Sequence, residues 1–239
     1  MRRHAVLFIC ALLGACGNEA APSTSAPATT GTVATTASTA ASTTTATVTT
    51  TATTISPATT VAAAEPGTIG YIGCSMTRAA VEGYAAVGGT RLWPAYDTAG
   101  AAIRAWADPV SELWGRFDEQ FAARPPAELW VQVCVFKSGN RFEHLQAAIA
   151  NLRTRCAECP LRIGWQPEYE PGWECDILGP DGIMHAREIA QDGVDRGLGD
   201  PDLSPMGALG ASTVDPTDGC HANDAGRMLL GEQLLAYFG

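Results

Sequence analysis

The folded part of this chain is predicted to be an α/β domain, a three-layer α/β/α arrangement with a mostly parallel central sheet. Strand-like and helix-like segments alternate along the sequence, and this alternation is typical of right-handed βαβ crossovers. The clearest strand-like segment, 128–136, has a length and β-branched content that suit a central parallel strand. Helices should therefore cover both faces, and ligands should bind beyond the carboxyl ends of the strands.

Four segments are predicted to form strands of this sheet. Residues 68–74 are predicted to be a buried first strand, and 90–93 a weaker second strand. Residues 128–136 give the clearest pattern, and their length and β-branched content favour a central position. Residues 161–165 are predicted to be a further strand.

Three segments between and after the strands show helical patterns. Asp108 and Pro109 resemble an N-cap and a first helical position. The apolar face of this helix repeats every four residues: Leu113, Phe117 and Phe121. The next helix carries one apolar stripe: Phe142, Leu145, Ile149 and Leu152. A weak helical period covers 183–194.

The chain closes with a predicted helix over residues 225–238. Asn223 or Asp224 directly precedes it, and either side chain can cap the first turn.

The first 15 residues are predicted to be a signal peptide. Arg2 and Arg3 provide a basic start, and residues 5–13 form an apolar run that is too short to span a membrane as a mature helix. Leu13-Gly14-Ala15-Cys16 resembles the bacterial lipobox, in which the cysteine is diacylated and becomes the first mature residue. Cys16 is therefore the predicted lipidation site, and the protein is expected outside the cytoplasm, anchored to the cell membrane.

Residues 16–66 are predicted to be a disordered stalk that follows the lipid anchor. Its Thr, Ala, Ser, Val and Pro residues cannot bury enough apolar surface to offset the ordering entropy. Residues 67–239 remain for one folded domain. The chain has a formal net charge of −10 and no basic cluster, so nucleic acid is not an expected partner. The domain is expected to be a monomer.

The predicted domain contains six cysteines: Cys74, Cys134, Cys156, Cys159, Cys175 and Cys220. An even number outside the cytoplasm favours disulfides. Six cysteines allow about 15 pairings, and the sequence alone does not choose among them.

Two short segments carry the residue types of nucleophilic catalysis. Asp218 lies three residues before His221 in a Gly-containing turn. A carboxylate there can fix the imidazole tautomer and stabilise the imidazolium that forms when the histidine takes a proton. Ser75 lies just past the first predicted strand, where a turn would expose its hydroxyl and the following backbone N–H groups.

Together these segments resemble those of the SGNH, or GDSL, hydrolase family. In that family a serine follows the first strand, and an Asp-x-x-His motif precedes the last helix. The resemblance implies a flavodoxin-like fold, with Ser75 as nucleophile, Asp218 as orienting acid and His221 as general base. The serine segment departs from the family pattern, because Cys74 stands where aspartate is usual.

The resemblance also implies an oxyanion hole, which in the family uses a glycine after the second strand and an asparagine after the third. The backbone N–H groups of Ser75 and Gly100 are the predicted donors. Residues 134–137 contain no asparagine, so one family donor is missing. The other candidate donors are Gly88, Gly89, Lys137 and Asn140.

The departures from the family pattern suggest disulfide hypotheses. Cys74 and Cys134 replace two family positions on neighbouring strand ends, so a bond between them would cross-link two catalytic loops. A Cys175–Cys220 bond would similarly hold the His221 loop. Cys156 and Cys159 would close a small loop.

The implied function is that of a serine esterase acting on small-molecule or glycan esters, such as carbohydrate or cell-envelope esters, without a cofactor or metal. Five aromatic residues are candidates to line the cleft: Trp93, Tyr96, Trp165, Tyr169 and Trp173. The missing asparagine keeps open an inactive domain of the same fold that binds a surface glycan or protein. Two further alternatives are a zinc site built from the cysteines with His221 and an enzyme with Cys74 as nucleophile.

Overall fold

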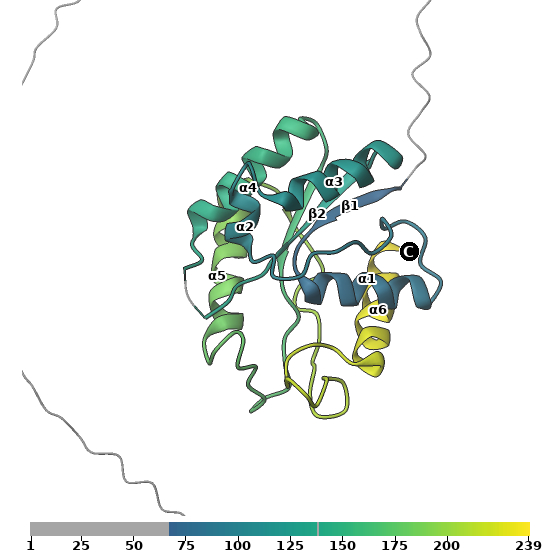
Figure 1. Cartoon of the computed structure of the whole chain (residues 1–239), viewed down its shortest axis with the longest axis vertical. Coiled ribbons are helices and arrows are strands. Elements are labelled where there is room, and N and C mark those ends of the chain that lie inside the picture. Colours follow the sequence, from purple (N-terminus) through teal and green to yellow (C-terminus); the bar gives the residue numbers. More distant parts are fainter. Residues whose placement is uncertain (1–66, 138) are drawn as a thin grey trace, which may run out of the picture. The chain divides into compact units, whose positions relative to one another are not determined.

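The computed structural model describes residues 67–137 and 139–239. Within them, four parallel strands form one sheet in the order β1-β2-β3-β4. The strands are β1 (Ile69–Ile72), β2 (Glu128–Val133), β3 (Leu161–Trp165) and β4 (Asp200–Pro201). Helices lie on both sides of this sheet (Figure 1). The predicted α/β fold class is therefore confirmed.

Six helices lie in the described part of the chain. They are α1 (Ser75–Ala86), α2 (Ile103–Ala107), α3 (Glu112–Ala123), α4 (Phe142–Arg155), α5 (Gly182–Asp195) and α6 (Asp224–Phe238). Helices α1 and α6 pack against each other on one side, whereas α2, α4 and α5 lie on the other (Figure 1). None of the helices in the described residues is long and apolar enough to cross a membrane.

Helices α1 and α6 approach each other closely because both carry a glycine at the crossing. A Cβ atom built on Gly83 of α1 would lie 1.8 Å from the backbone oxygen of Arg227. A Cβ built on Gly231 of α6 would lie 2.2 Å from the backbone of Gly83. The crossing therefore accepts no side chain at either position without a shift of backbone, and it sets how α1 lies beside the last helix.

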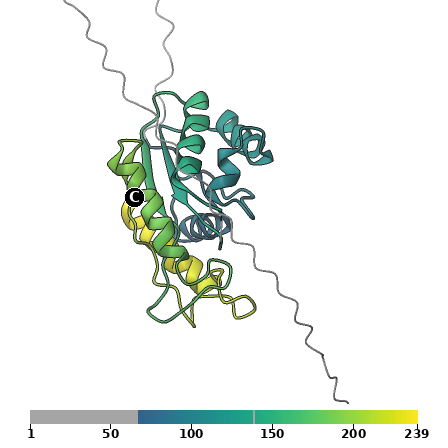
Figure 2. The ribbon, with the colours of Figure 1, turned by 90° about the vertical axis from the view of Figure 1, so that its left-hand side faces the viewer.

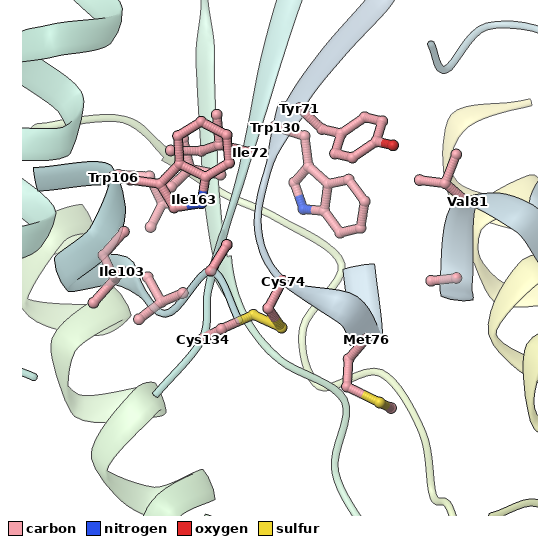
Figure 3. Close-up of a cluster of buried hydrophobic side chains, with 14 of the residues drawn as sticks. Tyr71, Ile72, Cys74, Met76, Val81, Ile103, Trp106, Trp130, Cys134 and Ile163 are labelled. Atoms are coloured by element: carbon pink, nitrogen blue, oxygen red, sulfur yellow. A yellow bond between two sulfur atoms is a disulfide. The ribbon is translucent and has the colours of Figure 1, made fainter. Parts of the chain in front are cut away.

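The interior of the domain is rich in large aromatic side chains. Trp93, Trp106, Trp114 and Trp130 are all at most 2% exposed. Figure 3 shows Trp106 and Trp130 in this core, with the Cys74–Cys134 disulfide at its lower edge. Most of the indole N–H groups reach backbone carbonyls; for example, the Trp106 N–H donates to Gly73 at 2.9 Å. The core thus supports the turn that follows β1.

The parallel register brings the carboxyl ends of the three long strands to the same edge of the sheet. Ile72 pairs with Val131, and Val133 pairs with Trp165. The loop between β3 and α5 and the loop before α6 gather at one end of the domain in both views (Figures 1 and 2). Ser75, Cys134 and Gln166, which follow the three strands, therefore belong to neighbouring segments.

The structure differs from the predicted elements at several boundaries. Residues 90–93 do not form a strand; Leu92 makes only an isolated parallel bridge with Ile69, and Pro94 has no backbone N–H to continue the pairing. Helix α3 begins after Ser111, whose hydroxyl accepts the Leu113 N–H. Asp108 instead accepts the Val110 N–H in a turn before the helix.

Other elements could not be recognised from their sequence. Strand β4 has only two residues, both exposed, and so shows no apolar pattern. The predicted strands at 68–74 and 128–136 are shorter in the structure, as β1 and β2. The predicted signal peptide (1–15), Cys16 and the stalk (16–66) lie outside the described residues.

Candidate active site

Ser75 is the first residue of α1 and directly follows the turn after β1. Cys74 is extended, and its N–H donates to the Thr77 hydroxyl at 2.8 Å. That hydroxyl in turn donates to the side-chain oxygen of the buried Gln132 at 2.6 Å. The first backbone N–H groups of a helix have no partner within the helix and favour an anion. The half-buried Ser75 hydroxyl therefore lies at a helix N-terminus, the kind of position that favours an anion.

Asp218 and His221 lie in one turn, and the Asp218 carboxylate accepts several hydrogen bonds within it. One Asp218 carboxylate oxygen, Oδ1, accepts the N–H groups of Cys220 and His221 at 2.8 and 3.0 Å. The other, Oδ2, lies 2.6 Å from Nδ1 of His221. Gly219 has φ +64°, a conformation that glycine adopts without strain. The turn therefore fixes the orientation of the imidazole ring.

The electrostatics keep Asp218 ionised. Burial raises the pKa of this carboxyl, but the hydrogen bonds from the His221 ring and from the two backbone N–H groups outweigh it, so the pKa lies below its ordinary value. An ionised Asp218 requires Nδ1 of His221 to carry the proton. Nε2 is then the acceptor when the ring is neutral.

The structure brings Ser75 and His221 together across 146 residues of sequence. Oγ of Ser75 lies 2.8 Å from Nε2 of His221. With Asp218, the three predicted side chains form one continuous chain of hydrogen bonds. A hydroxyl, an imidazole and a carboxylate in this order have the geometry that activates a serine nucleophile.

The loop that carries His221 is tied to the loop after β3. The Tyr169 hydroxyl donates to the Cys220 carbonyl, and the Trp173 N–H donates to the Gly219 carbonyl, both at 2.8 Å. Burial and the nearby charge of Asp218 raise the pKa of Tyr169, so its phenol stays protonated as the donor. Cys175 and Cys220 lie at disulfide distance, with 4.8 Å between their Cα atoms.

The other cysteines of the described residues also lie in pairs at disulfide distance. Cys74 and Cys134 connect the segments that follow β1 and β2, with Cα atoms 6.1 Å apart. Cys156 and Cys159 close a short loop after α4. The structure thus joins the same pairs that the hypotheses proposed, and a cysteine in a disulfide is neither a zinc ligand nor a nucleophile.

A narrow hollow of about 30 Å³ is lined by Ser75 and His221. Its walls are formed by Cys74, Ser75, Met76, Val135, Phe136, Gln166, Tyr169, Cys175, Ile177, Leu178, Cys220 and His221. A larger hollow of about 440 Å³ adjoins it and shares Phe136, Cys175 and Leu178 with it. A third hollow, of about 240 Å³, includes Tyr169 and Trp173.

Some predicted site residues lie elsewhere. Gly100 lines a separate recess with Ala99 and Arg116, so its predicted oxyanion role has no support from the shape of the Ser75 hollow. Lys137 lines the larger hollow, not the one with Ser75. The Asn140 side chain donates to the Phe136 carbonyl at 3.4 Å.

The aromatic residues proposed for the cleft separate into two groups. Tyr169 and Trp173 line the hollows, as expected. Trp93 and Tyr96 do not: they are 1% and 8% exposed and belong to the core, because the segment after residue 90 folds back beside β1. The Trp165 N–H donates to Glu168, and an arginine packs over its ring.

Gln166 is the site residue that the sequence did not indicate. It directly follows β3, is only 2% exposed, and lines the hollow with Ser75 and His221. A single glutamine between Trp165 and Pro167 forms no recognisable motif. Across residues 67–137 and 139–239, no three His, Cys, Asp or Glu side chains gather where they could hold a metal ion.

A comparison with solved structures places this fold beside a known one. A chain described as "a putative SGNH hydrolase from Slackia heliotrinireducens" matches with a TM-score of 0.50 and 15% sequence identity. The match covers 72% of this chain and 99% of that chain. No protein-family model and no curated protein matches the sequence. At this identity the likeness establishes the fold, which agrees with the α/β architecture described above.

Proposed function

We propose that this protein is a serine ester hydrolase in which Ser75, His221 and Asp218 are the catalytic residues. The observation that carries the proposal is the chain of hydrogen bonds from Ser75 Oγ through His221 to Asp218, with distances of 2.8 and 2.6 Å. Its position beyond the carboxyl ends of parallel strands, where such folds bind ligands, also supports it. The SGNH hydrolase-like fold adds a consistent scaffold.

The reaction is acyl transfer through Ser75. Nε2 of His221 takes the hydroxyl proton while Oγ attacks the ester carbonyl carbon, and the carbonyl π electrons move onto oxygen. The tetrahedral intermediate collapses, the bond to the alcohol oxygen breaks, and the imidazolium returns the proton to the alcohol. His221 then deprotonates a water molecule, whose oxygen attacks the acyl carbon; the bond to Ser75 Oγ breaks, and Oγ takes the proton back from the imidazolium as the carboxylic acid leaves. Asp218 stabilises the imidazolium in both halves.

The hollows suggest how an ester would lie. The space beside Ser75 is about 30 Å³, which suits a small acyl group, whereas the adjoining hollow of about 440 Å³ has room for a larger alcohol. Tyr169 and Trp173 offer aromatic surface near this region, and sugar rings pack well on such surfaces. We therefore favour short-chain esters of carbohydrates or of the cell envelope as substrates.

The proposed location is the outer side of the cell membrane. Signal peptide cleavage before Cys16 and lipidation of this residue would anchor the chain, and the stalk over 16–66 would hold the domain away from the membrane. This location would give the site access to envelope esters.

The test is hydrolysis of p-nitrophenyl acetate and p-nitrophenyl octanoate by residues 67–239 and by two variants. Ser75→Ala should lower kcat by roughly 10³-fold or more. Ser212→Ala, a matched exposed serine on the loop before His221, should retain wild-type activity. The acetate should be the better substrate. Equal rates for the wild type and Ser75→Ala would contradict the proposal and favour a domain that binds a glycan or protein without catalysis.

A further inference from the structure

Gln166 is a buried glutamine that lies at the wall of the candidate active site. It is the first residue after β3, and its backbone N–H donates to the Val133 carbonyl at 3.0 Å. This bond extends the β2–β3 pairing by one step and leaves the side chain at the carboxyl edge of the sheet. The side chain is 2% exposed, yet it lines the hollow that contains Ser75 and His221.

The orientation of the Gln166 amide is set by its neighbour. Oε1 accepts the backbone N–H of Val135 at 3.0 Å. Because Val135 can only donate there, the oxygen must face it and the amide nitrogen must face the other way. The assignment of the two amide atoms thus follows from the hydrogen bond itself.

The nitrogen of this amide is buried without a partner. Among the described residues, Nε2 of Gln166 has no hydrogen-bond partner. Buried donors are almost always paired, because an unpaired one loses its hydration without compensation. An unpaired buried donor at the wall of a reactive hollow is the arrangement expected when the missing partner is a ligand atom.

The candidate site also lacks a second hydrogen-bond donor for an oxyanion. The backbone N–H of Ser75, at the first turn of α1, is one candidate for binding an oxyanion. Gly100 lies in a separate recess, and the segment after β2, which is Cys134-Val135-Phe136-Lys137, offers no asparagine. Val135, which belongs to this segment, donates its N–H to the Gln166 side chain. The Gln166 side chain therefore extends from the end of β3 to the segment after β2, where no side-chain donor is present.

We infer that Nε2 of Gln166 donates a hydrogen bond to the oxyanion of the tetrahedral intermediate, together with the backbone N–H of Ser75. This inference rests on the proposed esterase function. Gln166 keeps its protons throughout: it binds the carbonyl oxygen as the π electrons move onto it, and it releases the oxygen when the carbonyl re-forms. It is thus a catalytic residue that stabilises the negative charge on the oxyanion and transfers no proton.

Two variants separate this role from a structural one. Gln166→Glu keeps an oxygen for the Val135 N–H but replaces the donor with a second oxygen. Gln166→Met has a similar length and lacks both functions. If Nε2 binds the oxyanion, both variants should lose about 10²–10³-fold in kcat with little change in KM. If Gln166 only holds Val135, Gln166→Glu should keep wild-type kcat and Gln166→Met alone should be impaired.

The pH dependence of kcat gives a second test, because a purely structural role of Gln166 would leave it unchanged. In Gln166→Glu, the substituted side chain can donate a hydrogen bond when its carboxyl is protonated, whereas the ionised carboxylate repels an oxyanion. The ratio of the kcat of Gln166→Glu to that of the wild type should therefore rise as the pH falls. Thermal unfolding of each variant would show whether the fold is retained, and the Gln166→Glu comparison stands even if Gln166→Met does not fold.

The outcomes distinguish this inference from the function on which it rests. The assays use p-nitrophenyl acetate with the wild type, Ser75→Ala and the Gln166 variants. Ser75-dependent hydrolysis with full kcat in Gln166→Glu at neutral pH would overturn the role of Gln166 and leave the esterase intact. Hydrolysis that does not depend on Ser75 would overturn both.

Discussion

The two halves of the candidate site are held in place by different means. Ser75 begins a helix, and the turn before it is supported from below by Thr77, Gln132 and the buried Trp106. His221 instead lies in an irregular loop that is joined to another loop by the Cys175–Cys220 disulfide and by two hydrogen bonds from aromatic side chains. Ser75 is thus positioned by regular structure and the core, with the Cys74–Cys134 bond directly before it, whereas His221 is positioned by cross-links between irregular loops.

This difference shows where each half is vulnerable. The serine half should respond to changes that disturb the packing of α1, since its geometry follows from regular structure. The histidine half lies in a small apolar cluster of Cys175, Leu178 and Cys220, separate from the main core. Local changes there should move the imidazole without unfolding the domain.

The largest effect is expected within the histidine half, from Asp218→Asn. The asparagine amide would donate to Nδ1 of His221, so the ring proton would move to Nε2 and the ring could no longer accept the Ser75 proton. We expect kcat for p-nitrophenyl acetate to fall about 10³–10⁴-fold, with a similar melting temperature. A kcat within tenfold of wild type would show that Asp218 does not set the tautomer.

A smaller loss of activity is expected when the cross-link of the histidine loop is removed. In Cys175→Ala/Cys220→Ala, displacement of the ring should lower kcat by about ten- to a hundredfold. The loss should exceed that in Cys74→Ala/Cys134→Ala, although both bonds close loops of similar size, with sequence separations of 45 and 60, and should stabilise the fold similarly.

The third disulfide provides the control for this comparison. Cys156→Ala/Cys159→Ala removes a bond with a sequence separation of 3 on a loop after α4. Its kcat should equal that of the wild type. If this variant lost as much activity as Cys175→Ala/Cys220→Ala, the loss would reflect general destabilisation and not a displaced His221.

The serine half is tested by a substitution in the packing of α1. Gly83→Ala places a methyl group against the backbone of α6, and the required shift should lower the free energy of unfolding by about 1–3 kcal/mol. Gly115→Ala is the matched control, because a Cβ there meets nothing within 4 Å. It should stabilise helix α3 by about 0.5–1 kcal/mol. Urea unfolding measures both, and equal effects would contradict the close crossing.

Local sequence patterns were sufficient for many of the elements. The β3 prediction at 161–165 agrees with the structure at both ends, and the apolar stripe beginning at Phe142 lies on α4. Asn223 caps α6 by accepting the Gly226 N–H. These features depend on residues within one or two turns of each other, so the sequence contains the information directly.

Other features depend on distant contacts. Residues 90–93 have a strand-like composition, but only Leu92 bridges to β1, and Pro94 cannot extend the pairing. Strand β4 exists because β3 offers a partner and not because Asp200 and Pro201 favour extended structure. Local patterns cannot reveal pairings that a neighbouring strand imposes.

The sequence by itself determined the order of the candidate site residues: a serine after the first strand and an Asp-x-x-His turn before the last helix. Only the tertiary structure decided which other groups meet them there. Gln166 faces the Ser75 hollow because the β2–β3 register places it beside Val135, whose N–H turns its amide. Such an arrangement arises from a hydrogen bond between segments 31 residues apart, which no local pattern in the sequence records.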